Sequence, residues 1–244
     1  MVKSVILAAG KGTRMKSDKP KVVHQVMGKP MVYYSIEAAR SAGADKVCVI
    51  VGYKADEVKK AVEESEAEIS ISYAVQEQQL GTGHAVKCAS DFIGTDGDVI
   101  ILCGDTPLVT GETLRKALDF HKENENGVTV ISALLDAPFG YGRIIRNGDS
   151  LEKIVEEKDA TDVEKTVKEV NSGMYIFNCD ALQAALTQIS NDNAQGEYYL
   201  PDAIEIIKKM GLKAAAVPMD DADQIRGVNT PEQLAEAEKI MAAR

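Results

Sequence analysis

Short apolar runs alternate along the chain with longer segments in which apolar and polar positions follow a helical spacing. Such runs are typical of buried strands, and such segments of amphipathic helices. The pattern predicts strands over residues 2–9, 46–51, 69–75, 98–103, 128–135, 170–177 and 213–217. It predicts helices over residues 30–42, 55–64, 111–124, 180–189, 199–210 and 231–243, and a further helix that ends near residue 91. The alternation predicts an α/β fold, with a mixed, mostly parallel sheet flanked by helices.

The pattern changes in the second half of the chain. Two strand-like segments, residues 139–145 and 151–157, flank an Asn-Gly-Asp sequence, and Asn-Gly between strands favours a tight hairpin turn. We therefore expect a small antiparallel lobe at about residues 137–225, placed so that it could close over the first half. Because no internal repeat or low-complexity linker divides the sequence, we expect residues 1–244 to form one domain that contains this lobe.

The composition argues against several classes of protein. No apolar run reaches the roughly 18 residues that suggest a membrane span. The chain passes from Met1 directly into a strand pattern, so we expect no signal peptide. The cysteines have no CxxC spacing, and we expect buried thiols in a reducing cytoplasm, not a zinc site or disulfides. They are Cys48, Cys88, Cys103 and Cys179.

The charge is distributed unevenly. The net charge is −10, which argues against nucleic acid as a partner. Residues 11–29 nevertheless hold six basic side chains and one acidic side chain, a local charge of +5, so the remainder of the chain carries −15. A positive island on an acidic protein suits a small polyanion better than an extended duplex.

The most unusual stretch is LAAGKGTRMKSDKPK, residues 7–21, which follows the first predicted strand. Gly10 and Gly12 allow positive φ and a close approach of the backbone to phosphate oxygens. Arg14 can donate to two phosphate oxygens at once, while Lys21 supplies a point charge. We therefore interpret this stretch as a strand followed by a loop that wraps a nucleoside triphosphate.

The sequence of this loop departs from two other well-known nucleotide-binding loops. A Walker A loop requires GxxxxGK followed by Ser or Thr, and that order is absent. The dinucleotide fingerprint GxGxxG has Met15 in place of its third glycine, so an NAD site is not expected. A solvated basic loop, which is what charged runs usually form, remains the alternative.

Ligands of open α/β sheets bind at the carboxyl ends of the strands. Loops of unusual composition are expected there at residues 7–21, 76–83, 103–107 and 227–230. Asp105 directly follows an apolar strand, where its carboxylate could bind Mg²⁺ or cap the next helix. Gln76 and Gln79 carry amides that can read the edge of a pyrimidine, although the same segment could be a helix start with small residues.

Several motifs resemble one known family. LAAGKGTRM followed by KPKV resembles the signature of sugar-phosphate nucleotidyltransferases, and QLGTGHA, GDTP, YGR, IVEEKDA, NSG and VN extend the resemblance over the whole chain. It is closest to the uridyltransferase domain of bacterial N-acetylglucosamine-1-phosphate uridyltransferases. The resemblance implies a Rossmann-like nucleotidyltransferase fold. It also implies uridylyl transfer from UTP to N-acetylglucosamine 1-phosphate, with release of pyrophosphate, for cell-wall and lipopolysaccharide precursors.

The resemblance also implies roles for individual residues. The catalytic residues would be Arg14 and Lys21. The nucleotide would be bound by Leu7, Ala8, Ala9, Gly10, Gln76, Gln79, Gly81 and Thr82. The sugar would be bound by Gly142, Glu156 and Asn171, and Mg²⁺ by Asp105 and Asn229. The residues alone leave open that Glu156 and Glu157 form a solvated strand face, or that Asn229 is a turn residue before a helix cap at Thr230. His84 is expected to have a structural role.

Bifunctional members of the family continue into a left-handed β-helix that acetylates glucosamine 1-phosphate and forms a trimer. This sequence has no hexapeptide repeat, so we expect no acetyltransferase domain within it, and a trimer only if that domain is present. Two rival functions remain: nucleotidyl transfer with another base or sugar, and non-catalytic sensing of a nucleotide sugar.

Overall fold

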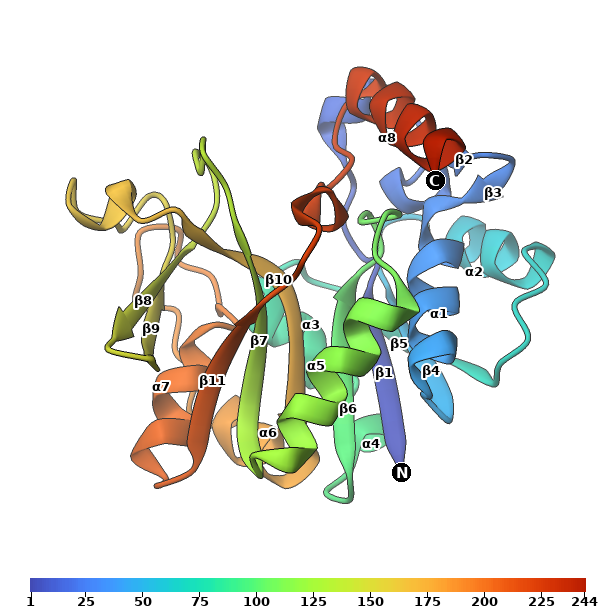
Figure 1. Ribbon diagram of the computed structural model, residues 1–244. Helices are drawn as coiled ribbons and strands as arrows, with labels where there is room; N and C mark the ends of the chain where they lie inside the picture. Colours follow the sequence, from blue (N-terminus) through green and yellow to red (C-terminus); the bar gives the residue numbers. More distant parts are fainter.

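The computed structural model describes residues 1–244, and a nine-stranded sheet runs through it (Figure 1). Its main strands are β1 (Val2–Leu7), β4 (Lys46–Val51), β5 (Ile71–Val75), β6 (Asp98–Cys103), β7 (Asn126–Leu134), β10 (Glu169–Asn178) and β11 (Lys213–Pro218). They lie in the order β11-β7-β10-β6-β1-β4-β5. Strand β10 is antiparallel to both of its neighbours, β6 and β7, while the other pairs along this order are parallel. The predicted mixed, mostly parallel sheet is confirmed.

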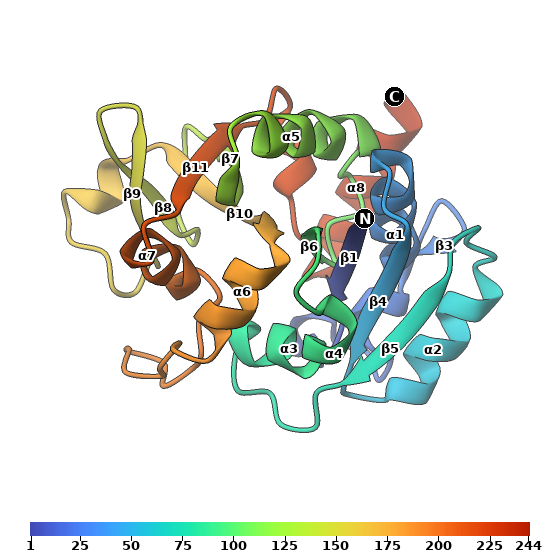
Figure 2. The same cartoon turned by 90° about the horizontal axis from the view of Figure 1, so that it is seen from below.

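Helices cover both faces of the sheet, as Figure 2 shows from below. One face is covered by α1 (Met31–Ala42), α2 (Ala55–Glu64) and α5 (Gly111–Glu123), and the other by α3 (Thr82–Cys88), α4 (Ser90–Ile93), α6 (Cys179–Leu186) and α7 (Asp202–Lys209). Each face forms a core of 27 buried residues, so neither face of the sheet is left to solvent. Burial on both faces explains why strands such as β4 and β6 are almost continuously apolar in sequence.

A third, smaller apolar cluster lies beyond the carboxyl ends of the parallel strands. Helix α8 (Pro231–Ala243) packs there, near the short strands β2 (Gln25–Val26) and β3 (Lys29–Pro30) (Figure 1). The cluster consists of Met15, Val26, Met31, Leu108, Val228 and Ala237. It therefore joins the first loop, the segment after β6 and the chain before α8. The Thr230 hydroxyl accepts a hydrogen bond from Gln233 N, which confirms the expected helix cap.

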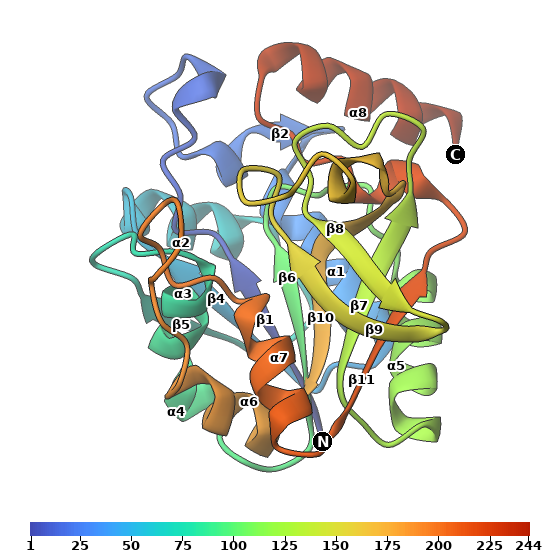
Figure 3. The same cartoon turned by 90° about the vertical axis from the view of Figure 1, so that its left-hand side faces the viewer.

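The predicted hairpin is also confirmed. Strands β8 (Arg143–Asn147) and β9 (Ser150–Val155) pair antiparallel, and β8 joins β10 through one residue pair, Arg143 with Val170. Figure 3 shows this hairpin standing in front of the central strands. Strands β10 and β11 also fall within the range expected for the lobe, but they belong to the main sheet order. Within residues 137–225, the β8–β9 hairpin is therefore the part that lies off the main strand order.

Some predicted boundaries were wrong. Helix α7 begins at Asp202, not Tyr199, because the preceding residues bond to the α3 region: Tyr198 N donates to Leu80 O and Leu200 N to Thr82 Oγ1. The helix predicted to end near residue 91 is divided into α3 and α4 at Ala89. Four short 3₁₀ segments had no clear signal in the pattern: η1 (Thr13–Met15), η2 (Lys21–Val23), η3 (Glu164–Thr166) and η4 (Ala222–Ile225).

None of the helices combines the length and apolar character needed to cross a bilayer. All four cysteines are free thiols; Cys48 and Cys179 are buried as expected, whereas Cys88 and Cys103 are partly exposed.

Candidate active site

The order of the strands reverses beside β1. Strands β4 and β5 follow β1 on one side, whereas β6 lies on its other side. Such a switch point opens a crevice at the carboxyl ends of the strands, where ligands of α/β proteins bind. Leu7 is paired with Cys103 in the register, and Gly104 N donates a 2.9 Å hydrogen bond to Leu7 O. The first loop and the segment that contains Asp105 therefore leave the sheet side by side.

A cavity of about 340 Å³ opens at this switch point, within the size range of small-molecule sites. All eight residues expected to bind the nucleotide line it, together with two of the expected charged residues. Its lining consists of Leu7, Ala8, Ala9, Gly10, Lys21, Val22, Gln76, Gln79, Gly81, Thr82, Ala85, Cys103, Asp105 and Glu197. The tertiary structure thus brings four separate stretches of sequence around one hollow.

The structure constrains the two glycines of the first loop, Gly10 and Gly12, in different ways. Gly12 has φ of +68°, and a Cβ there would collide with the side chain of Lys21. The expectation of positive φ was wrong for Gly10, which does not adopt it. A Cβ at Gly10 would meet no atom within 4 Å, so this backbone faces open space. Gly10 can therefore be approached closely by a ligand.

The side-chain amides of the second loop, residues 76–83, are held in place by hydrogen bonds. Gln76 is buried; its Nε2 donates to Gly81 O at 3.1 Å and lies 3.1 Å from His84 Nδ1. Gln79 Nε2 donates to Ala9 O at 2.7 Å and so connects this loop to the first loop. Because His84 is engaged with Gln76, its position fits the structural role expected for it.

The glycines of the second loop serve packing that the sequence did not reveal. A Cβ at Gly81 would lie 2.6 Å from Tyr198 O, and one at Gly83 would lie 3.0 Å from the same atom. Gly81 also has φ of +109°. Residues 197–200 therefore lie directly against this loop, and Glu197 lines the cavity. No local pattern near Glu197 pointed to this contact.

Lys21, Asp105 and Asn229 meet at one point. The Lys21 ammonium forms an ion pair with Asp105 and donates a 2.8 Å hydrogen bond to Asn229 Oδ1. Val228 N donates to Asp105 O at 2.9 Å, which ties the turn before α8 to the end of β6. Two oxygen donors thus converge on one cation.

This donor set fits Mg²⁺, which prefers oxygen ligands and is commonly held by only one or two protein groups, with substrate phosphates and water completing its coordination. The expected metal ligands Asp105 and Asn229 are therefore close together and chemically suited to a divalent cation.

Arg14 lies apart from this cluster. It belongs to η1, its side chain is exposed, and it forms no hydrogen bond or ion pair in the structure. It does not line the cavity, although the neighbouring Met15 is anchored in the cluster under α8. No other group holds the guanidinium, so it is free to turn toward a ligand.

The residues expected to bind the sugar also lie together. Asn171 N donates a 2.8 Å hydrogen bond to Gly142 O, and a Cβ at Gly142 would lie 3.1 Å from Glu156 Oε1. The β10 register shifts after Asn171, and Gly173 in this bulge approaches the thiol of Cys103, 3.3 Å from where its Cβ would lie. Strand β10, which carries Asn171, thus approaches the end of β6 through Gly173, and Cys103 also lines the cavity at the switch point.

Cys103 is unsuited to act as a nucleophile. The residue is partly exposed, but its thiol is enclosed; this burial raises the thiol pKa to about 12, and the nearby Asp105 carboxylate adds to the shift. Because the thiolate is the reactive form, this side chain stays neutral at ordinary pH. Its contribution to the site is therefore one of shape.

Glu156 is a half-buried carboxylate without a cationic partner. Burial raises its pKa, and the nearby carboxylates Asp159 and Asp202 raise it further. Neither Lys nor Arg forms an ion pair with it, whereas the adjacent Glu157 pairs with Arg143 at 2.7 Å. Because its carboxylate oxygens accept no hydrogen bond in the structure, they are available to a ligand that brings hydroxyl groups.

Replacing Glu156 by glutamine is expected to raise KM for the sugar phosphate about tenfold or more and to leave KM for the nucleotide nearly unchanged. The reason is that hydrogen bonds to a charged group contribute about 1.5–3 kcal/mol. Steady-state kinetics with each substrate varied in turn would measure this. Glu152→Gln, an exposed residue on β9, is the control. A Glu156 variant with normal KM for the sugar phosphate would contradict the assignment.

Asp202 gives the fold a pH dependence. Burial, followed by the Glu205 and Asp159 charges, raises its pKa from 3.8 to about 6. Because the folded state holds this proton more tightly, stability is lost as pH rises through that window. We expect Asp202→Asn to stabilise the protein at pH 7.5 by about 1 kcal/mol, since solvent screens this partly exposed carboxylate, with the gain disappearing toward pH 4. Thermal unfolding at both pH values would measure it, and an equal or opposite effect at the two would contradict it.

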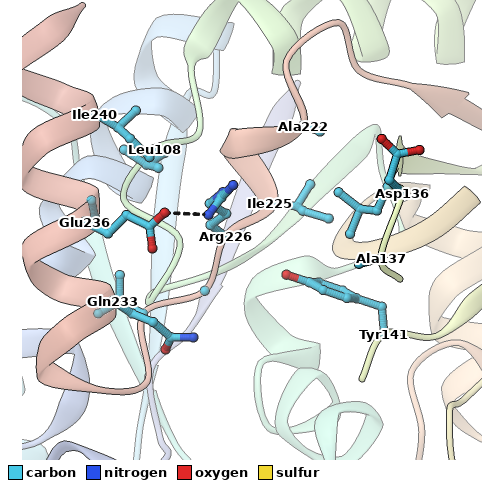
Figure 4. A pocket seen from close by; sticks show the side chains of 14 residues that line it. Leu108, Asp136, Ala137, Tyr141, Ala222, Ile225, Arg226, Gln233, Glu236 and Ile240 are labelled. Atoms are coloured by element: carbon cyan, nitrogen blue, oxygen red, sulfur yellow. Dashed lines mark hydrogen bonds and ion pairs between the residues drawn. The ribbon is translucent and has the colours of Figure 1, made fainter. Parts of the chain in front are cut away.

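A second cavity, of about 360 Å³, lies between α8, η4 and residues 135–141. In Figure 4 the Tyr141 hydroxyl points across it toward Ile225 and Arg226, and the Arg226 guanidinium is held by Glu236 at 2.8 Å. None of the expected site residues lines this cavity, but Tyr141 and Val228, which do, directly adjoin Gly142 and Asn229. This cavity separates residues 135–141, which lead into the β8–β9 hairpin, from η4 and α8.

Comparison with known proteins agrees with this geometry. A profile of the nucleotidyl transferase family matches residues 3–237. The chain belongs to the nucleotidyl transferase family. It is 53% identical over 242 residues to the bifunctional protein GlmU of Caldanaerobacter subterraneus subsp. tengcongensis, and 50% identical over 242 residues to that of Thermoanaerobacter pseudethanolicus. Each match covers 99% of this chain and 52% of the relative, so the chain spans about half the length of these relatives.

A solved structure supports the fold of this nucleotidyl transferase. A UDP-glucose pyrophosphorylase in complex with UDP-glucose superposes with a TM-score of 0.78 at 19% sequence identity. The match covers 99% of this chain and 98% of that chain. At this low identity the likeness extends to the fold alone.

Proposed function

We propose that this chain transfers uridylyl from UTP to N-acetylglucosamine 1-phosphate, giving UDP-N-acetylglucosamine and pyrophosphate. The observation that carries the proposal is the meeting of three sets of residues at one switch point. A cationic glycine loop, two amide side chains and the oxygen donor Asp105 line one cavity, and Asn229 joins Asp105 through the Lys21 ammonium. The near-50% identity to GlmU proteins over almost the whole chain supports the same reaction.

The chemistry we propose is an in-line displacement. An oxygen of the sugar phosphate forms a bond to the α-phosphorus of UTP, and the bond to the pyrophosphate oxygen breaks. The attacking phosphate is already ionised, so no general base is required, and catalysis rests on positioning and charge neutralisation. Mg²⁺, held by Asp105 and Asn229, would supply much of that neutralisation when bound. In this proposal Lys21 stabilises the α-phosphate and Arg14 the departing pyrophosphate.

Substrate recognition is divided between the two halves of the site. We assign the uracil to Gln76, Gln79, Gly81 and Thr82, and the sugar to Gly142, Glu156 and Asn171, within a single domain of residues 1–244 whose sugar-binding lobe spans about 137–225. A cytoplasmic location would follow from these substrates. Assembly into a trimer is proposed only for a chain that also carries a β-helix domain, and no acetyltransferase activity is assigned to these residues.

Pyrophosphate release tests the proposal. The purified chain is supplied with Mg²⁺ and UTP, together with either N-acetylglucosamine 1-phosphate or glucose 1-phosphate, and then with CTP, dTTP or GTP in place of UTP. We expect the highest kcat/KM with UTP and the N-acetylated sugar. A preference for another base or for glucose 1-phosphate would replace the substrate assignment. Binding of UDP-N-acetylglucosamine without any pyrophosphate release would indicate a sensor instead.

A further inference from the structure

The Lys21 ammonium lies where the two oxygen donors converge. It contacts both expected metal ligands at once, Asp105 through an ion pair and Asn229 Oδ1 at 2.8 Å. The side chains of Lys21 and Asp105 are only 17% and 19% exposed, so the pair is substantially shielded from water. A cation thus already neutralises the Asp105 carboxylate in the ligand-free protein.

The Lys21 side chain lies between the Asp105–Asn229 pair and the first loop, so its ammonium can contact either. The aliphatic part of the side chain packs against Gly12 in the first loop, where a Cβ would collide with it. The residue also lines the nucleotide cavity. A rotation about the side-chain bonds of Lys21 can therefore move the ammonium from Asp105 and Asn229 toward a phosphate group held beside that loop.

We propose that Lys21 keeps the metal site closed in the free protein, and that an incoming nucleotide phosphate draws the ammonium away and opens it. The inference rests on the proposed function, because it takes Asp105 and Asn229 as metal ligands. A divalent ion that approaches them in the free protein meets a positive charge in the same position and must displace it. The site therefore binds its metal together with the triphosphate and discriminates against free divalent ions.

Cooperative binding of metal and nucleotide would not by itself test this mechanism. The phosphates of the nucleotide also ligate Mg²⁺, so they would strengthen metal binding even if Lys21 did not move. The decisive state is the protein without nucleotide. There, the proposal requires that removal of the ammonium alone strengthens metal binding.

The experiment measures binding of Mn²⁺, a paramagnetic substitute for Mg²⁺, to the full chain without nucleotide, by the loss of the free Mn²⁺ resonance signal. We expect Lys21→Met to bind Mn²⁺ about tenfold or more tightly than the wild type, within the usual range of coupling between sites. Lys19→Met, an exposed lysine two residues away, removes the same charge and should leave the affinity unchanged. Adding Asp105→Asn to Lys21→Met should abolish the gain.

An affinity of Lys21→Met equal to or weaker than that of the wild type would overturn the proposal, as would an equal gain in Lys19→Met. Thermal unfolding verifies that each variant is folded, and Lys21→Gln replaces Lys21→Met if the latter is not. The measurement requires neither sugar nor turnover. Failure of the uridylyl transfer assay would therefore leave this result interpretable, and the two proposals can fail separately.

Discussion

Replacement of Asp105 by alanine is expected to lower kcat by about 100-fold or more, which is the scale for removing one electrostatic stabiliser from an active site. Asp105 is the only carboxylate of the converging donor pair, and it lies directly at the end of β6. Its loss removes the charged ligand proposed for Mg²⁺ and leaves the Lys21 ammonium with only the neutral amide of Asn229. The fold should remain, because the Asp105 side chain contributes nothing to the apolar cores.

The kinetics of pyrophosphate release at saturating UTP and Mg²⁺ would measure this effect. Asp105→Asn keeps the shape without the charge and should lose nearly as much activity, because a neutral amide is a weaker ligand for a hard cation. Asp119→Ala, an exposed carboxylate on α5, serves as the control. Near-normal turnover in Asp105→Ala, with the same unfolding temperature, would remove this residue from the site.

Replacement of Arg14 by alanine is also expected to lower kcat on the order of 100-fold. Arg14 has no partner in the ligand-free structure, so the substitution breaks no contact that stabilises the fold. Any loss of activity would therefore report on an interaction made only with a ligand. We expect the loss to fall mainly on kcat, since the proposed contact is to the pyrophosphate as its charge develops in the transition state.

Two further variants sharpen this prediction. Arg14→Lys retains the charge but not the planar fork, and should recover only part of the activity. Arg40→Ala removes an exposed arginine on α1 that pairs with Glu37, and should have no effect on turnover. If Arg14→Ala kept wild-type kcat at saturating substrates, the pyrophosphate would have to be stabilised by another group.

Much of the fold could be predicted because its elements are locally encoded. The apolar runs of β4 and β6 and the amphipathic spacing of α1, α2 and α5 follow from the periods of strand and helix. The boundaries that failed depend on distant residues. Helix α7 starts late because the chain before it is bonded to Leu80 and Thr82, more than 100 residues earlier in the sequence.

The candidate site, too, has features that the local sequence predicts and features that depend on distant residues. The motifs pointed to candidate residues, and the structure brings the eight that were expected to bind the nucleotide to one cavity. Other features had no local signal. Gly81 and Gly83 are required by the chain at Tyr198 that packs against them, not only by a ligand. The expected positive φ at Gly10 was wrong, since only Gly12 needs it.

The sequence by itself determined the kinds of element, the acidic chain with its one basic island, and the chemical groups available for binding phosphate, metal and sugar. Only the tertiary structure decided which of these groups meet. Lys21 and Asn229 are 208 residues apart along the chain, yet the order of the strands and the packing of α8 bring them to hydrogen-bonding distance. Local periodicity specifies elements because it reflects neighbouring residues, whereas a site at a switch point depends on long-range packing.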